Sequence, residues 1–369
     1  MKRDNTLNAF LALVRAGLWE SEVRLSEFVE IDFNELYRLA QEQSVIGLVA
    51  AGLEHVVDYK VPKEISLQFA GQTILIEQQN KAMNHFVETM VAGMREADIY
   101  TLLVKGQGIA QCYERPFWRS CGDVDLFLSD DNYIRAKKFL EPLASEVEQE
   151  KKYERHIGFI IDSWTVELHG NLRTGISNSI DKGVDEIQKE VFFDGSVRSW
   201  INNGTYIFLP SENTDALLVF THILQHFFKG GIGLRQICDW CRLLWMYRDT
   251  IDQKTLEKRI RQMGIMTEWK TFASLAVHAL GIEKSAMPFY QETEKWRSNG
   301  EKVLSVVIET GNMGHNRDLS YQQNDNTTLR KFKTFVFLTK DTFRHLSIFP
   351  LDSIKAWWNI MVKGINVII

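Results

Sequence analysis

The chain has 369 residues, of which 45% are hydrophobic and 25% are charged, so it is an ordinary globular protein with enough residues for two or three domains. Its net charge of −5 makes nucleic acid an unlikely partner, because proteins that bind nucleic acid usually carry a basic surface. No run reaches the roughly 18 apolar residues of a transmembrane helix, and residues 1–20 show no secretory leader. We therefore expect a cytoplasmic protein whose four cysteines are reduced.

Residues 1–97 are expected to form a helical region. Apolar residues recur at helical spacing between Leu7 and Val14, and again between Leu36 and Ala40. The longest pattern of this kind runs from Ile65 to Ala97. It predicts one or two long helices that lead into the first strand.

The stretch from Ile99 to Leu128 carries the strongest functional signal. Its apolar run from Tyr100 to Val104 predicts a strand, which Lys105, Gly106, Gln107 and Gly108 interrupt. A short helical segment follows, and Gly122 then makes a turn before a second strand at residues 123–128. The order is therefore strand, glycine turn, helix and strand.

Two aspartates, Asp123 and Asp125, lie on this second strand. Side chains alternate between the faces of a strand, so both carboxylates leave the same face. They repel each other, and aspartate is a poor strand former, so a cation is expected to compensate. Mg²⁺ that bridges to phosphate oxygens is the natural candidate. Most Asp-x-Asp pairs are solvated turn or edge residues, and the neighbouring glycine turn is what favours chemistry here.

A third carboxylate, Glu167, follows in a predicted hairpin. Residues 157–161 and 165–168 read as its strands, joined by a turn at Asp162 and Ser163. Glu167 could share the metal and orient or deprotonate an attacking hydroxyl, or it could be a surface residue that faces a lysine. His169 lies on the same face of the strand and could contact phosphate or acceptor, or only cap the edge of the sheet.

Two further short strands are expected before the chain turns helical. Residues 191–193 and 206–209 are apolar, and Asn202, Asn203 and Gly204 mark a turn between them. Ser211 then follows Pro210 as a possible helix cap.

A helix after residue 213 carries His222 and His226, four residues apart and therefore on one face. The pair could bind zinc, or it could be hydrogen-bonded wall or core residues, since the glutamate of the HExxH motif is missing. Cys238 and Cys241 form a CxxC inside the following helix, without a second pair to complete a metal site. We expect these cysteines to be buried packing residues.

A basic, glycine-rich loop at residues 229–233 precedes this following helix. A helix start behind glycines suits an anion, and the cations of this segment could instead form a salt bridge between domains. Arg235 and Asp239 are four residues apart and could pair with each other.

The segment at residues 351–369 is rich in tryptophan and isoleucine. It could cap the helical core, lie on a membrane surface, or form a dimer seam.

Three stretches carry a resemblance to a known family. They are LLVKGQGIAQCYERPFWRSCGDVDLFL at 102–128, TVELHGNLR at 165–173 and HILQHFFKGGIGLRQICDWCRLL at 222–244. At these residues the chain resembles the uncharacterised bacterial nucleotidyltransferases of the DNA polymerase β superfamily, many of which are encoded near polysaccharide-biosynthesis genes. The resemblance implies an α+β fold, with a small mixed nucleotidyltransferase sheet and flanking helices at 98–210. Mostly helical regions at 1–97 and 211–369 would precede and follow it.

The resemblance also implies an activity and a site. The expected reaction moves a nucleoside monophosphate from an NTP to the hydroxyl or phosphate of an unidentified acceptor, a small molecule related to polysaccharides. Two Mg²⁺ ions would be held by Asp123, Asp125 and Glu167. The nucleotide would contact Lys105, Gly106, Gln107, Gly122, His169, Lys229, Arg235 and Asp239. The superfamily usually has serine or glycine where Gln107 stands.

Two other functions remain open from the sequence. One is a catalytically silent NTP-binding or scaffold protein, and the other is a toxin-like enzyme that nucleotidylates a protein or tRNA. The sequence is also compatible with a homo-oligomer.

Overall fold

The structure is a computed structural model that describes residues 2–151, 154–193, 195, 197–312 and 327–366. Its strands are β1 (Leu102–Val104), β2 (Asp123–Phe127), β3 (Glu146–Val147), β4 (His156–Ile161), β5 (Trp164–His169), β6 (Val197–Asn202) and β7 (Thr205–Pro210). The helices up to the second hairpin are α1 (Lys2–Trp19), α2 (Phe33–Glu42), α3 (Ile46–Glu54), α4 (Lys63–Glu96), α5 (Gly106–Ala110), α6 (Asp130–Leu140) and α7 (Asn178–Phe193). The later helices are α8 (Glu212–Lys229), α9 (Leu234–Met246), α10 (Gln253–Met263), α11 (Met266–Leu280), α12 (Glu294–Thr310), α14 (Thr327–Leu346) and α15 (Pro350–Asn366). The predicted α+β fold is confirmed.

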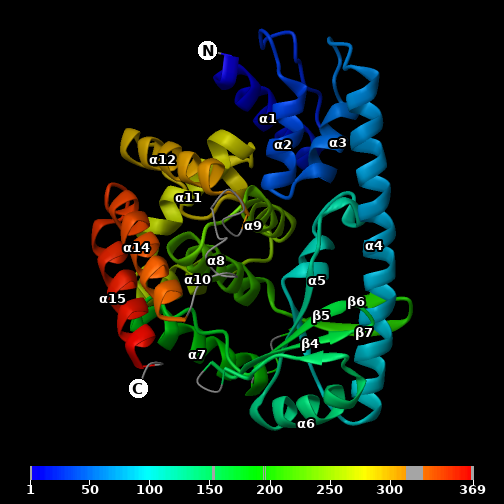
Figure 1. Ribbon diagram of the computed structural model, residues 1–369, viewed down its shortest axis with the longest axis vertical. Coiled ribbons are helices and arrows are strands. Elements are labelled where there is room, and N and C mark those ends of the chain that lie inside the picture. The colour runs from blue at the N-terminus through cyan, green and yellow to red at the C-terminus, as the bar shows by residue number, and fades with distance from the viewer. Residues whose placement is uncertain (1, 152–153, 194, 196, 313–326, 367–369) are drawn as a thin grey trace.

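Helix α4 links the two ends of the molecule. The apolar pattern left one or two helices open, and the structure has one uninterrupted helix of 34 residues that begins directly after Pro62. Its first half packs beside α2 and α3, and its second half lies along the strands (Figure 1). The helix therefore connects the N-terminal helices to the sheet.

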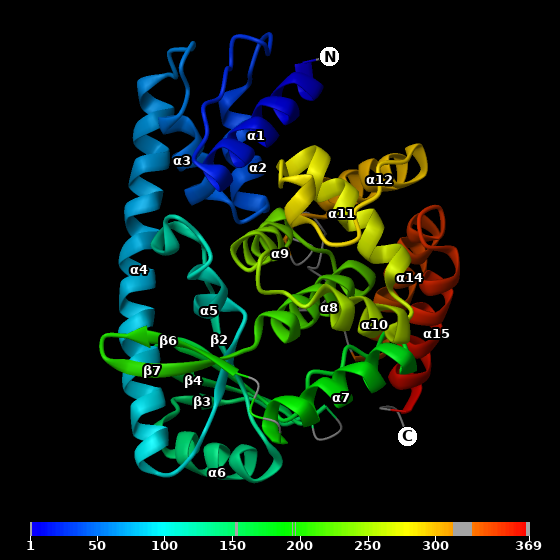
Figure 2. The same cartoon turned by 180° about the vertical axis from the view of Figure 1, so that it is seen from behind.

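The sheet has the strand order β1-β2-β5-β4-β3. Figure 2 labels β2, β3 and β4 of this sheet. Strand β2 pairs with β5 in parallel, and the other neighbours are antiparallel. The predicted hairpin is present, and its turn residues Asp162 and Ser163 both have positive φ. Because β2 and β5 are neighbours, Asp125 lies directly across from Glu167.

The two faces of the sheet have different neighbours. Val124 and Leu126 of β2 belong to a buried cluster with residues of α4, α6 and β7. The alternate positions carry Asp123 and Asp125 to the opposite face. On that side Phe127 packs against Phe192 of α7, with ring centroids 4.9 Å apart. The alternation of residues thus turns the carboxylates toward the helices that follow the sheet.

Strands β6 and β7 form a separate two-stranded sheet around the predicted turn, where Asn203 and Gly204 both have positive φ. The prediction of a strand at residues 191–193 is wrong, since these residues end α7. Val191 continues the buried face of that helix four residues after Ile187.

One hydrophobic cluster joins both ends of the chain. It contains Phe10 of α1, Phe220 of α8, Trp269 of α11 and Ala356 of α15, all buried. The N-terminal and C-terminal helices therefore share a core, and the division at residues 97 and 210 stays a prediction.

The C-terminal segment caps this helical core over its described part. Ser353 and Ala356 are buried, and Asn359 Nδ2 donates to the backbone oxygen of Ile176 at 2.7 Å. Trp358 on α15 is exposed. Residues 367–369 lie outside the described residues. Among the helices that the structure describes, none has both the length and the hydropathy for a bilayer crossing.

Candidate functional site

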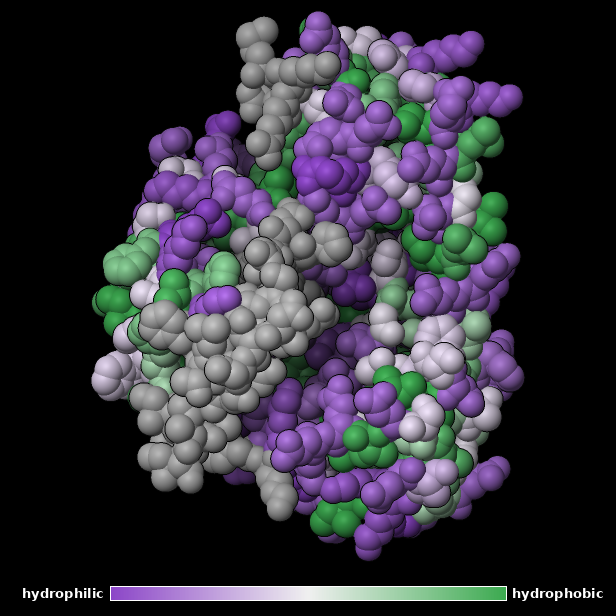
Figure 3. All heavy atoms as spheres, viewed as in Figure 1, coloured by the Kyte–Doolittle hydropathy of each residue, from purple (hydrophilic) through white to green (hydrophobic). Residues whose placement is uncertain are grey.

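A cavity of about 320 Å³ lies between the carboxylate face of the sheet and helices α8 and α9. The surface is hollowed and mainly hydrophilic near the middle of the face that Figure 3 shows. Nine of the predicted site residues line the cavity: Lys105, Gly106, Gly122, Asp123, Asp125, Glu167, His169, Arg235 and Asp239. Gln107 and Lys229 do not line it.

Three carboxylates converge on the sheet side of the cavity. Asp123 and Asp125 come from β2 and Glu167 comes from β5, and one ligand atom of each lies within 4.8 Å of the others. Asp125 is almost fully buried, whereas Asp123 and Glu167 are partly exposed to the cavity. Strand periodicity predicted the shared face of Asp123 and Asp125, the family resemblance implied that Glu167 joins them, and the structure brings all three together.

The carboxylates repel one another strongly in this partly buried place. The charge of Asp125 and then burial raise the pKa of Asp123 above its ordinary value. Burial alone would raise the pKa of Asp125, but Lys105 and His169 hold it below the usual range. Burial likewise opposes ionisation of Glu167, and His156 and His169 overcome this and lower its pKa. The three carboxylates thus carry more negative charge than a protein interior holds without compensating positive charge.

The turn between β1 and α5 brings a lysine beside these acids. Lys105 Nζ lies 2.9 Å from Asp125 Oδ1. Burial would lower the pKa of Lys105, but Asp125 and its acidic neighbours raise it, so the side chain carries a positive charge. Lys105 has φ 59° and ψ −145°, a conformation that is rare outside glycine, and Gly106 has φ 38°. Strained backbone of this kind is concentrated at functional sites.

The side chain of Gln107, which was predicted to contact the nucleotide, lies away from the cavity. Its side chain is 2% exposed and points toward α4, where Nε2 donates to Asn84 Oδ1 and to the backbone oxygen of Asn80. It thereby ties the turn to the long helix and does not face the cavity. The helical geometry that begins at Gly106 rotates the next side chain away from the sheet. Lys229 is the last residue of α8 and lies outside the cavity lining.

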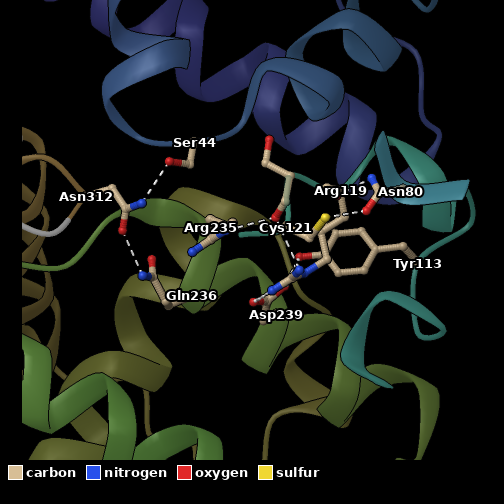
Figure 4. Close-up of polar contacts among 10 residues, drawn as sticks. Ser44, Asn80, Tyr113, Arg119, Cys121, Arg235, Gln236, Asp239 and Asn312 are labelled. Carbon is tan, nitrogen blue, oxygen red and sulfur yellow. Dashed lines mark hydrogen bonds and ion pairs between the residues drawn. The ribbon is translucent and has the colours of Figure 1, made fainter. Parts of the chain in front are cut away.

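A buried ion pair holds the loop before β2 to α9 (Figure 4). Arg119 donates through Nε and Nη2 to the two oxygens of Asp239, both at 2.7 Å, and Tyr113 donates its hydroxyl to the same carboxylate. The predicted pairing of Arg235 with Asp239 is wrong, because Asp239 pairs with Arg119 and Arg235 instead donates to the backbone oxygen of Ser120.

Arg235 is left facing the cavity without a carboxylate partner among the described residues. Its Nη1 donates to the backbone oxygen of Ser120 at 2.9 Å, and its buried Nε has no hydrogen-bond partner there (Figure 4). Burial and the neighbouring Arg119 lower its pKa from the ordinary value. A buried guanidinium in a cavity beside carboxylates is suited to an anionic ligand.

Two residues of the site had no signal in the sequence that would identify them. His156 Nε2 lies 3.1 Å from Glu167 Oε2, and it reaches this place because β4 and β5 pair His156 with His169. Arg119 reaches Asp239 across 120 positions of sequence. Both contacts depend on tertiary register, which local patterns do not specify.

The histidine pair on α8 lines the cavity wall. The rings of His222 and His226 contact each other with centroids 4.3 Å apart. No third ligand of the usual metal-binding types joins them within the described residues. Burial and then the charge of Lys105 lower both pKa values, that of His226 to about 4. Both imidazoles are therefore neutral at pH 7, as wall residues would be.

The cysteines of the CxxC are buried free thiols, as predicted. Burial raises the pKa of both Cys238 and Cys241, which disfavours the reactive thiolate.

Comparison with known proteins identifies the family but no individual relative. A family model described as "Uncharacterised nucleotidyltransferase" matches residues 29–281. Neither the comparison with curated proteins nor that with solved structures found a match. The matched residues include all seven strands, the three converging acids and the helices of the cavity wall. This chain belongs to the uncharacterised nucleotidyltransferase family.

Proposed function

We propose that the protein transfers a nucleoside monophosphate from an NTP to an acceptor hydroxyl or phosphate. The observation that carries this proposal is the meeting of Asp123, Asp125 and Glu167 at one cavity, within 4.8 Å of one another. Membership of a nucleotidyltransferase family supports it.

The three acids fit a divalent cation. Carboxylate oxygens are the ligands that Mg²⁺ prefers, and a cation would relieve the repulsion that raises the pKa of Asp123. Asp123, Asp125 and Glu167 would hold it. When bound, it would neutralise phosphate charge and polarise the reacting phosphoryl group. That two such ions bind stays a prediction.

The remaining residues would position the phosphates and the acceptor. Arg235, whose guanidinium is buried and whose Nε has no hydrogen-bond partner among the described residues, would bind phosphate oxygens at the α9 side of the cavity. Lys105 would add positive charge beside Asp125, and Gly106 would allow the backbone to approach the phosphates. His169 lies 2.8 Å from Asp125 Oδ1 and would hold that carboxylate in place.

In the proposed step, the acceptor oxygen attacks the α-phosphorus. A new bond forms between that oxygen and phosphorus, the bond from phosphorus to the bridging oxygen breaks, and pyrophosphate leaves. Glu167, which His156 contacts at 3.1 Å, would orient an acceptor hydroxyl, whose proton would leave to water in the cavity. Positioning and charge stabilisation would supply most of the rate acceleration.

The test is transfer of radiolabel from the α-phosphate of each of the four NTPs to molecules of a cell extract, with Mg²⁺. We expect labelled product from one or more NTPs, and a loss of at least about 100-fold in Asp123→Asn. Asp131→Asn is the matched control, because Asp131 is exposed on α6. Equal turnover by the Asp123→Asn protein would contradict the proposal.

A further inference from the structure

A second set of metal-binding side chains lies next to the three acids. It consists of His156, Glu167 and His169, and one ligand atom of each lies within 4.8 Å of the others. Strand register creates it, because His156 on β4 lies directly across from His169 on β5. Glu167 precedes His169 by two residues and therefore shares its face of the strand. All three residues line the main cavity.

The distances in this cluster match those between the ligands of one metal ion. Glu167 Oε2 lies 3.1 Å from His156 Nε2 and 3.4 Å from His169 Nε2. His169 Nε2 also lies 2.8 Å from Asp125 Oδ1, and a bound metal would replace this contact. Ligand atoms at about 2.1 Å from a common ion are separated by about 3.0 Å at right angles and about 3.4 Å at the tetrahedral angle. The cluster supplies three protein ligands, and the cavity leaves space for water or substrate at further positions.

The donor atoms distinguish this place from the acid triad. Asp123, Asp125 and Glu167 offer only oxygen, which suits hard cations such as Mg²⁺. Two imidazoles and one carboxylate instead suit first-row transition metals, Zn²⁺ among them. Glu167 belongs to both sets, and a shared carboxylate is a natural bridge in a two-metal site for phosphoryl chemistry.

We propose that His156, Glu167 and His169 bind a transition-metal dication of the Zn²⁺ type, beside a hard cation on Asp123, Asp125 and Glu167. The protein would then hold two different metals that share Glu167. The catalytic part of this inference rests on the proposed function, because the transition metal would be the second cation of the proposed active site. The claim that the metal binds depends only on the geometry of the three side chains.

Hydrogen bonds between histidines and carboxylates could by themselves explain the distances, and a direct metal measurement separates the two cases. The full-length protein is stripped of metal with a chelator and titrated with Zn²⁺ in a calorimeter. X-ray absorption then counts the imidazole nitrogens bound to the zinc. We expect one tight site per chain with two imidazole ligands.

Variants assign the site to its residues. His156→Gln and His169→Gln should each weaken Zn²⁺ binding at least about 10-fold and leave one imidazole on the zinc. His85→Gln is the surface control, because His85 is 75% exposed on α4, and His226→Gln tests the other histidine pair of the same cavity. Both should retain the site, and circular dichroism checks that every variant is folded.

The outcomes separate this inference from the proposed function. Zinc binding that persists unchanged in His156→Gln and His169→Gln, or a zinc without imidazole ligands, would overturn the inference even if the protein transfers nucleotides with Mg²⁺ alone. A two-imidazole zinc site in a protein that turns over none of the NTPs would support the site and count against the proposed function.

Discussion

At the scale of single residues, Asp239 is the partner on which two other buried groups depend. Its carboxylate accepts from both Arg119 and Tyr113, and the side chains of Arg119 and Asp239 are only 5% and 8% exposed. Burial has removed water from both charges, and the cost of this desolvation offsets much of the attraction between them. Removal of one partner leaves the other charge buried and uncompensated.

Asp239→Asn should therefore lower the free energy of unfolding by about 3–5 kcal/mol. The matched control is Glu257→Gln, which breaks the pair of Glu257 with Arg261 on α10, where both side chains are well exposed. That change should cost less than about 1 kcal/mol. Urea denaturation at pH 7 measures both. Similar losses of stability in the two variants would show that the buried pair contributes no more to the free energy of unfolding than the exposed pair.

A second residue, Glu268, makes the stability depend on pH. Glu268 of α11 is 1% exposed and lines a small cavity with Asp352 and Lys355 of α15. Burial, together with the charge of Asp352, raises its pKa from 4.5 to about 9. Between these values the folded chain keeps a proton that the unfolded chain has lost. The stability from this group is therefore complete below pH 4.5 and is lost as pH rises toward 9.

Glu268→Gln removes this titration and keeps the shape of the side chain. We expect the variant to gain stability over the original chain as pH rises from 5 to 8, by on the order of 4 kcal/mol at the upper end. Urea denaturation at pH 5, 6, 7 and 8 gives the two curves. If the curves run parallel, Glu268 ionises in the folded protein as it does in the unfolded chain.

At the scale of elements, α1 and α3 approach each other through glycines. A Cβ atom at Gly52 would lie 2.1 Å from the backbone oxygen of Leu13, and one at Gly17 would lie 1.9 Å from that of Leu48. Both contacts are with backbone, which cannot rotate away as a side chain can. The two helices would have to move apart to admit even a methyl group.

Gly52→Ala should accordingly destabilise the protein by about 1–3 kcal/mol, although alanine favours helices. Gly71→Ala on α4 is the matched control, since no atom lies within 4 Å of the added methyl group. That change should stabilise by about 0.5–1 kcal/mol. Opposite signs in urea denaturation are the expected result, and a gain in both variants would contradict close packing of α1 on α3.

Elements with a clear period were predictable from the sequence, and ambiguous runs were not. The pattern from Ile65 to Ala97 is long enough to specify a helix, and alternation around Asp162 and Ser163 specifies a hairpin. The three apolar residues at 191–193 fit either a strand or the end of a helix. They are helical because Val191 is buried on the same face of α7 as Ile187. Short runs lack the length that distinguishes the two periods.

The same limit applies to the candidate site. Strand alternation predicts that Asp123 and Asp125 share a face, and only the family resemblance implied that Glu167 joins them. The pairing of β2 with β5 is what brings Glu167 there. The partners of these acids depend on contacts between distant segments. Arg119 lies in a loop and His156 at the start of a strand, so only the assembled fold brings them to the cavity.

At the scale of the whole molecule, the cavity lies where the sheet meets the shared helical core. Its sheet side carries the three acids, and α9 supplies Arg235 from the other side. The N-terminal and C-terminal helices belong to one hydrophobic cluster, so we expect them to unfold together. A ligand that contacts both sides of the cavity should therefore stabilise the entire chain.

An NTP with Mg²⁺ at 100 times its dissociation constant should add about 2.7 kcal/mol, which corresponds to a rise in Tm of about 3–4 °C for a chain of this size. The proposed cation bridges protein and phosphates, so a chelator should remove most of the rise, and Asp123→Asn should show little of it. Thermal unfolding followed by circular dichroism, with each NTP in turn, measures the shift. Asp131→Asn should respond as the unchanged chain does, because its carboxylate is exposed on α6. An equal rise in Asp123→Asn, or one that survives the chelator, would mean that the nucleotide binds without help from a metal at the acids.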